Sequence, residues 1–329
     1  MGRKVIKRIL VSILSLFVIS IFSFALMQLA PGGPMAMYAE NPKITAADKE
    51  RIKVQMGLDK PVHIRYYRWI THMLRGDMGK SYMTGRPVST EILTRLPATL
   101  KLMFASFIIS VGIAIPIGIY SATHRYSFAD QIVTFGSFFG ISIPSFWFGL
   151  LMILVFSLSL KILPAGGYST PWFDPSEYPL IIRPIAVFIE NFKYLIMPAI
   201  VLSLMNTASW SRYMRSSMLD VINQDYIRTA RAKGVPEKQV VNKHALRNAM
   251  TPIITIMGLD LPSFFAGAVI TETIFAWPGM GRLFITAVNN RDYQVLMGIV
   301  MVTAVLVLLG NFIADLLYSI LDPRVKYEG

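Results

Sequence analysis

The feature that most constrains this chain is a series of long apolar runs, each bounded by charged residues. A helix that crosses the roughly 30 Å hydrocarbon core of a bilayer needs about 20 residues. Because the runs approach or exceed that length, we predict an all-α integral membrane protein with six transmembrane helices. The predicted spans are Ile9–Leu29, Leu102–Ala122, Ile132–Leu160, Tyr194–Trp210, Pro252–Ile270 and Val295–Leu317.

Composition supports this fold class. Only 16% of the residues are charged and 54% are hydrophobic, whereas a soluble domain has about 25% charged residues. The chain has no cysteine, which excludes disulfides, iron–sulfur clusters, thiolate zinc sites and cysteine catalysis. The first run is longer than the roughly 7–15 apolar residues of a signal peptide, so we interpret it as a retained span.

Basic residues in the short loops predict the orientation. Residues 211–251 carry eight Lys or Arg and the N-terminus carries four, whereas residues 161–193 and 271–294 carry three and two. Because such residues gather on the cytoplasmic side, we expect both termini inside. Residues 31–98 hold eleven, but a segment of that length lies beyond the range of the rule. These loops account for much of the +13 net charge without a nucleic-acid partner.

The long segment after the first span predicts a small, mainly helical extracytoplasmic lobe. Thr45 and Asp48 match a capping box, and Gly57 can end the helix that they begin. A second helix is expected beyond Pro61, with an apolar stripe at Val62, Tyr66, Trp69 and Met73 that favours packing on the membrane domain over binding an aromatic ligand. We therefore divide the chain into residues 1–98, the first span plus the lobe, and 99–329, a five-helix membrane core with a cytoplasmic loop at 211–251. Gly and Pro clusters at 31–34, 164–167 and 277–281 are expected to form outer-face turns.

The sequence gives little support for a catalytic site or a cofactor-binding site. Gly79-Lys80-Ser81 resembles the end of a nucleotide-binding loop, but Leu74 stands where that motif needs glycine. The four histidines are scattered, with no metal-ligand spacing. We therefore predict no catalytic residue, no cofactor and no metal site, and do not expect an enzyme.

Few ionisable residues lie inside the predicted spans. Asp260 stands near the middle of the fifth, and Asp315 lies toward the inner end of the sixth. Because an intramembrane acid is costly, Asp260 is either a functional site or a partner in a hydrogen bond between helices. Ser142 and Pro144 mark a place where the third span can break. These three residues, Asp260, Ser142 and Pro144, are our candidates for polar positions in a pore.

The most informative segment is the loop between the fourth and fifth spans. Asp225 can cap a short helix that ends at Gly234, and a second helix can start past Pro236. Small residues at Thr229, Ala230 and Ala232 would allow close approach, so the loop predicts a knob that fits a partner's groove. A basic amphipathic hairpin lying on anionic lipid is the alternative.

This loop resembles the EAA loop of permease subunits in ABC importers. Arg228-Thr229-Ala230 and Gly234 align with the general pattern, although two of the three leading positions differ. Asp-Tyr-Ile-Arg-Thr-Ala-Arg-Ala-Lys-Gly at 225–234, followed by His-Ala-Leu-Arg-Asn-Ala at 244–249, is similar to the variant in dipeptide, oligopeptide and nickel permeases. The resemblance implies that the loop contacts an ATPase through Asp225, Tyr226, Arg228, Thr229, Ala230, Ala232, Gly234, Val235 and Arg247.

Further motifs extend the resemblance along nearly the whole chain, among them Leu29–Gly32, Leu96–Leu100, Leu163–Gly167, Thr271–Gly279 and Asp322–Arg324. The long segment after the first span resembles the DppB/OppB-type subunit. The resemblance implies an importer of di- or oligopeptides in a bacterial or archaeal cytoplasmic membrane. Its expected partners are a C-type permease subunit, two ATP-binding subunits, an extracytoplasmic peptide-binding protein and membrane lipid.

Two alternatives from other classes remain open at the level of sequence. One is a proton-coupled secondary transporter that uses Asp260. The other is a membrane-anchored scaffold or sensor that transports nothing.

Overall fold

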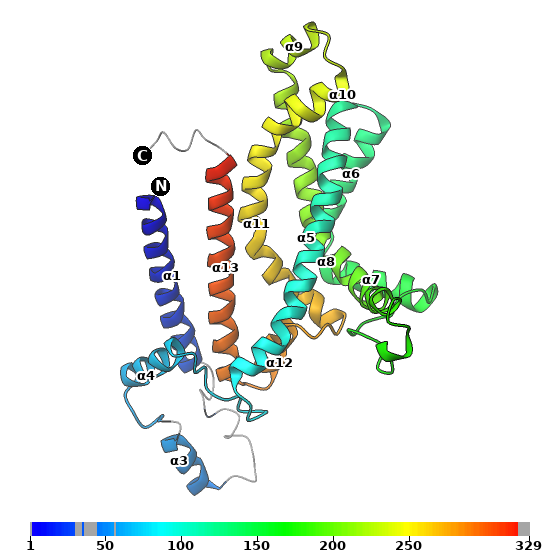
Figure 1. The fold of residues 1–329 in the computed structure, drawn as a ribbon. Coiled ribbons are helices and arrows are strands. Elements are labelled where there is room, and N and C mark those ends of the chain that lie inside the picture. The colour runs from blue at the N-terminus through cyan, green and yellow to red at the C-terminus, as the bar shows by residue number, and fades with distance from the viewer. Residues whose placement is uncertain (1, 30–34, 36–44, 56, 322–329) are drawn as a thin grey trace. The chain divides into compact units, whose positions relative to one another are not determined.

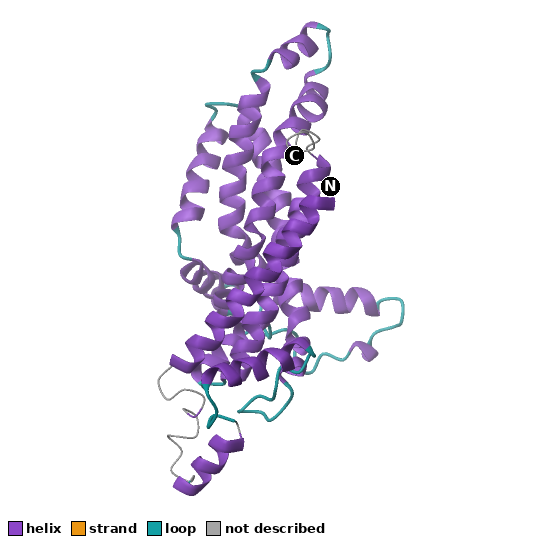
Figure 2. Ribbon diagram, turned by 90° about the vertical axis from the view of Figure 1, so that its left-hand side faces the viewer, coloured by secondary structure: helices purple, strands orange, loops and turns teal. Residues whose placement is uncertain are grey.

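The computed structural model describes residues 2–29, 35, 45–55 and 57–321. This part of the chain is almost entirely helical, and its only extended pairing is an isolated bridge between Lys80 and Pro87 (Figure 2). Its contacts divide the chain into two compact units. The first comprises residues 1–97 and 279–309, and the second comprises residues 98–278 and 310–329. The sequence analysis divided the chain differently, into the first span plus the lobe (1–98) and the five-helix core (99–329), and that division stays a prediction.

The first unit holds the N-terminal span and the short helices that follow it (Figure 1). Its complete helices are α1 (Gly2–Leu29), α3 (Ala46–Gln55), α4 (Val62–Leu74) and α12 (Met280–Asn289). The N-terminal part of α5 (Val88–Thr123) and most of α13 (Tyr293–Leu321) also belong to it.

The two helices predicted in the segment after the first span are present. The Asp48 backbone N–H donates to Thr45 Oγ1 at 3.2 Å, and the Thr45 N–H donates to Asp48 Oδ2 at 3.3 Å, which is the predicted capping box. Gly57 follows α3 with φ +67°. In α4, Tyr66 and Trp69 lie 5.4 and 5.7 Å from the ring of Phe24 in α1, so this part of the predicted stripe packs on the first span.

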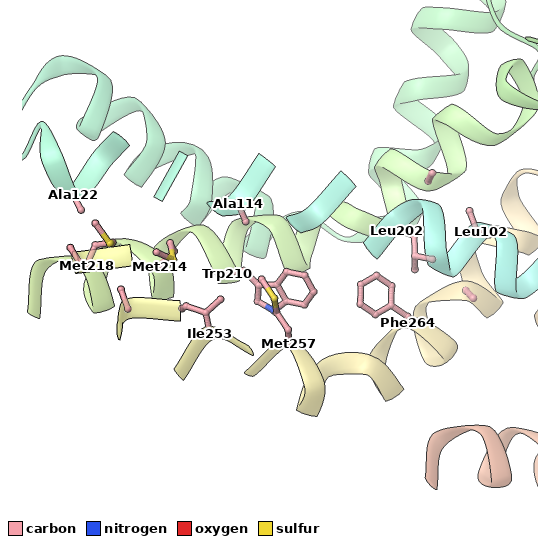
Figure 3. Packing of buried hydrophobic residues seen from close by; sticks show 14 of the residues in the cluster. Leu102, Ala114, Ala122, Leu202, Trp210, Met214, Met218, Ile253, Met257 and Phe264 are labelled. Carbon is pink, nitrogen blue, oxygen red and sulfur yellow. The ribbon is translucent and has the colours of Figure 1, made fainter. Parts of the chain in front are cut away.

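The second unit contains the remaining helices. They are α6 (Phe128–Ser142), α7 (Ser145–Met152), a π-helix at Ile153–Ser159, a 3₁₀ turn at Pro175–Glu177, α8 (Arg183–Ile222), α9 (Asp225–Ala232), α10 (Glu237–Gln239), a π-helix at Val240–Ala245 and α11 (Leu246–Ile274). Helices α8 and α11 run side by side (Figure 1). Their facing residues form much of the unit's core, in which Trp210, Met257 and Phe264 meet (Figure 3).

Each predicted span is mostly helical within the described residues, but fewer than six helices are long and apolar enough to be classed as spans. Four qualify, at Ile6–Leu29, Val88–Thr123, Arg183–Ile222 and Tyr293–Ala314. A fifth is added if α6 and the segment 145–159 count as one span. Helix α11, which contains the fifth predicted span, is not in this set. The number six and the orientation of the termini therefore stay predictions.

The third predicted span breaks where Pro144 was expected to interrupt it. Helix α6 ends at Ser142, and the next helical segment leaves at an angle of 105°. Pro144 is the N-cap of α7 and lacks the N–H that a continuous helix would need.

Two of the predicted turns, at 164–167 and 277–281, make hydrogen bonds within the second unit. The Gly167 N–H donates to the Phe275 carbonyl at 2.8 Å, and a Cβ at Gly166 would lie only 2.4 Å from that carbonyl oxygen. Trp277 is fully buried, and its Nε1–H donates to the Ala98 carbonyl at 2.9 Å. The third predicted turn, at residues 31–34, lies outside the described residues.

Candidate functional site

Helix α9 and the turn after it form one end of the α8–α11 pair (Figure 1). The prediction that Asp225 caps this helix is wrong, because Gln224 occupies the N-cap and Asp225 is the first helical residue. Its carboxylate interacts with the positive helix N-terminus and lies 3.6 Å from Arg228. An acidic residue is favourable at either position, so the sequence alone did not separate them.

The predicted stop at Gly234 is confirmed. The residue has φ +76°, a conformation that costs L-residues about 1–2 kcal/mol. The Gly234 N–H donates to the Arg231 carbonyl at 2.9 Å, and the Val235 N–H donates to the Ala230 carbonyl at 3.3 Å. These bonds satisfy carbonyls left open at the end of α9. Pro236 then stands at the N-cap of α10, so the second helix begins where it was predicted.

An ion pair spans the turn between α9 and α10. Arg231 donates from Nε to Glu237 Oε2 at 3.0 Å and from Nη2 to Oε1 at 2.6 Å. The hydrogen bond from Arg231 lowers the pKa of Glu237, and the hydrogen bond to Glu237 raises the pKa of Arg231. Both side chains are largely exposed, so the pair defines the shape of the turn more than it adds stability.

The opposite face of α9 packs into the core of the second unit. Ile227 is fully buried and Ala230 nearly so, together with Val240 and Ala245 of the following π-helix. The Asn248 amide donates to the Tyr226 hydroxyl at 2.8 Å, which fixes the start of α11 beside α9. The loop is therefore a compact knob held by the ends of α8 and α11. We call residues 225–249 the coupling knob.

The structure places the nine predicted contact residues on both faces of this knob. Ala230 is buried and Val235 is half-buried. The other seven are exposed, namely Asp225, Tyr226, Arg228, Thr229, Ala232, Gly234 and Arg247. An exposed surface with two positive and one negative side chain is available to a partner, and Ala230 supports it from inside.

Asp260 makes the interhelical hydrogen bond that was one of its two predicted interpretations. The Trp210 Nε1–H of α8 donates to Asp260 Oδ2 of α11 at 2.7 Å. Trp210 is completely buried among Phe107 and Phe264, and Figure 3 shows it between α8 and α11. The carboxylate thus satisfies an indole donor that would otherwise be orphaned.

The other two candidate pore residues, Ser142 and Pro144, lie at the break between α6 and α7. Ser142 is the last residue of α6, and Pro144 precedes α7. Both are exposed within the described part of the chain. Their part in a pore stays a prediction.

One buried polar cluster was missed by the sequence analysis. Arg215 of α8 donates to both carboxylate oxygens of Asp130 in α6, at 2.7 and 2.8 Å, and to Ser121 of α5 at 3.1 Å. Ser121 also donates to Asp130. A second contact between α6 and α8 joins Ser137 and Ser211 at 3.1 Å. Asp130 and Arg215 are 85 residues apart, and no local pattern links them.

Comparisons with known proteins place the chain in a family. The family of binding-protein-dependent transport system inner membrane components matches residues 114–327, and the N-terminal component of such systems matches residues 1–103. The inward-facing methionine ABC transporter MetNI has a similar fold, with a TM-score of 0.54 and 17% identity over 70% of this chain and 96% of that one.

Several curated relatives are similar over nearly their whole length. The oligopeptide transport system permease protein AppB of Bacillus subtilis is 47% identical, over 99% of this chain and 100% of AppB. The probable D,D-dipeptide transport system permease protein DdpB of Escherichia coli is 39% identical over 94% of both chains. The di/tripeptide permease protein DppB of Pseudomonas aeruginosa is 36% identical over 98% of both. The chain therefore belongs to the family of binding-protein-dependent transport system inner membrane components.

Proposed function

We propose that this chain is the DppB/OppB-type permease subunit of an ATP-driven importer that moves di- or oligopeptides across a bacterial cytoplasmic membrane. The observation that carries the proposal is the full-length similarity to permease proteins named for oligopeptide, dipeptide and tripeptide transport. These relatives favour this function over the proton-coupled alternative through Asp260. The interhelical bond from Trp210 gives that acid a structural role instead.

The proposed orientation has six spans with both termini and the coupling knob in the cytoplasm. The eight basic residues of the 211–251 loop support it, since such residues gather on the inner side. The segment after α1 then faces the outside, where α4 packs on the first span.

ATP hydrolysis is proposed to take place on two partner ATPases. The exposed side chains of α9 would sit in a groove of one ATPase, and its movement would be passed to α8 and α11. Three contacts support such transmission, because a rigid knob moves as one piece. They are the buried Ile227, the bond from Ser217 Oγ to the Ala249 carbonyl at 2.9 Å, and the bond between Asn248 and Tyr226.

The remaining proposed partners are a C-type permease subunit and an external peptide-binding protein. The C-type subunit would complete the pore, and the binding protein would deliver and select the cargo. Because the backbone of a peptide offers the same groups whatever its sequence, we propose that selection lies mainly on the binding protein.

Peptide uptake by a reconstituted complex tests the function. Vesicles that contain both permeases and both ATPases should accumulate a labelled dipeptide when ATP and the binding protein are supplied. Orthovanadate should abolish this uptake and a protonophore should not. Uptake that requires a proton gradient and is insensitive to orthovanadate would contradict the proposal.

A charge reversal on α9 tests the coupling knob. Arg228→Glu changes an exposed side chain whose ion-pair partner, Asp225, is itself exposed, so the fold should survive. We expect ATPase binding and ATP-driven uptake to fall. Arg51→Glu, an exposed arginine of α3, is the matched control and should leave both unchanged.

A further inference from the structure

A second site lies in the first unit. A pocket of about 360 Å³ opens between the end of α1, helix α4, the loop before α5 and the start of α13. Phe24, Met27 and Met297 form its apolar wall. Its polar lining includes Gln28, Arg65, Arg68 and Trp69.

Two buried donors in this lining have no hydrogen-bond partner among the residues that the structure describes. They are Gln28 Nε2 and Trp69 Nε1. The guanidinium of Arg65 donates to Gln28 Oε1, which fixes the amide so that its NH₂ group remains a donor. Buried donors are nearly always satisfied in native proteins, by protein groups, ordered water or a ligand. A pair of them in one pocket indicates an occupant that brings acceptor oxygens.

The charges of the pocket limit what that occupant can be. Arg65 and Arg68 supply two positive charges, and the neighbouring Asp77 supplies a negative one. Asp77 is already engaged, since its Oδ2 lies 2.9 Å from His72 Nδ1 and its Oδ1 accepts from the Gly79 N–H at 2.9 Å. A single carboxylate fits this balance better than a phosphate with two charges, which Asp77 would repel. The apolar wall has room for a side chain attached to that carboxylate.

We propose that this pocket binds the C-terminal carboxylate and last side chain of a short peptide, with Arg65, Arg68, Gln28 and Trp69 as donors. The inference rests on the proposed function for its substrate class. Paired donors with guanidinium groups are a strong arrangement for carboxylate recognition. Because Gln28 Nε2 and Trp69 Nε1 are both buried, binding includes a small shift of the groups that cover them. In the proposed orientation, the site lies on the outer side and would hold a peptide before it enters the pore.

Direct binding to the assembled complex is the test. The complex is placed in nanodiscs of phosphatidylcholine without the binding protein, and the affinities for Ala-Phe and for Ala-Phe-amide are measured. We expect the amide to bind about tenfold more weakly or worse, since it lacks the charged acceptor. Arg68→Gln and Trp69→Phe should each weaken Ala-Phe about tenfold. Arg51→Gln, outside the pocket, is the matched control and should bind Ala-Phe normally.

Trp69→Phe separates binding from structure. It keeps an aromatic ring against Phe24 and removes an N–H that has no partner within the described residues, together with one ring of the indole, so any fall in thermal stability without peptide should be limited to that lost packing. Equal binding of acid and amide, or unchanged Ala-Phe affinity in both pocket variants, would overturn the proposal. So would a Trp69 effect that is seen only in phosphatidylglycerol discs, because a lipid headgroup would then be the occupant. Weaker docking of the binding protein in both variants, with peptide affinity unchanged, would equally refute it.

Uptake measured on the same preparations keeps the two proposals apart. Normal ATP-driven peptide uptake without any binding at this pocket would reject the pocket and leave the function intact. Failure of the wild-type complex to transport any peptide would reject the function.

Discussion

At the scale of single residues, the Trp210–Asp260 hydrogen bond explains why an acid is tolerated where an apolar side chain would be expected. A carboxylate at the bilayer centre costs about 2.5–3.5 kcal/mol on insertion scales. A buried indole N–H without a partner costs about 1–3 kcal/mol. In the proposed six-span topology, the 2.7 Å bond between Trp210 and Asp260 lowers both costs.

Asp260→Asn should therefore retain most transport. The amide oxygen can still accept from Trp210, whereas Asp260→Leu removes the acceptor and should destabilise the subunit by about 1–3 kcal/mol. Peptide uptake in ATP-loaded vesicles, with and without a protonophore, measures the effect. Loss of uptake in the Asn variant, together with protonophore sensitivity of the wild type, would restore the proton-coupled hypothesis.

Gly234 gives a second prediction at this scale. A Cβ there would meet no atom within 4 Å, so any cost of substitution comes from the backbone at φ +76°. Gly234→Val should cost about 1–2 kcal/mol locally and reduce coupled ATP hydrolysis while membrane insertion continues. Gly234→Asn is the control, because asparagine adopts this conformation more easily. Normal coupling in the Val variant would show that the turn does not matter.

At the scale of elements, the α9–α10 turn is held by backbone bonds, a buried Ile227 and the Arg231–Glu237 pair. These contributions respond differently to pH. The backbone bonds and apolar packing do not titrate, whereas Glu237 has a pKa lowered by its bonds from Arg231.

The turn should consequently loosen in acid. A carboxyl group with a lowered pKa in the folded state stabilises above its ordinary pKa, and this contribution is lost as the pH falls through the lowered value. Amide hydrogen exchange at residues 233–240 should show that wild type is better protected than Glu237→Gln at pH 7. The two proteins should converge toward pH 3. A constant difference across this range would mean that the ion pair does not stabilise the turn.

At the scale of the whole molecule, orientation in the membrane is the property on which the proposed function depends. Lys238 lies on the coupling knob, and Trp172, which is 82% exposed, lies in the loop between the bent third span and α8. The proposed topology places them on opposite sides of the membrane.

Labelling of single cysteines tests this placement, and the cysteine-free chain makes the background clean. In sealed cells, a membrane-impermeant thiol reagent should reach Trp172→Cys and not Lys238→Cys. Permeabilised cells provide the control, in which both should react. External labelling at position 238 would reverse the orientation and remove the cytoplasmic ATPase as a partner of the knob.

The sequence by itself determined the features that depend on local chemistry. Apolar runs predicted where the helices lie, Pro144 predicted the break in the third span, and Gly234 predicted the end of α9. Each follows from hydrophobic length or from the allowed backbone angles of one residue. The position of Asp225 was missed by one residue, because acids are favourable both at the N-cap and in the first turn.

Only the tertiary structure decided which distant polar groups meet. Asp130 and Arg215 come from different helices, as do Trp210 and Asp260, and the two unpartnered donors lie on α1 and α4. Sequence periodicity assigns a residue to a helix face but does not specify which neighbour that face meets. That choice depends on how whole helices pack, so the pairing of Asp260 and the polar pocket of the first unit became visible only in three dimensions.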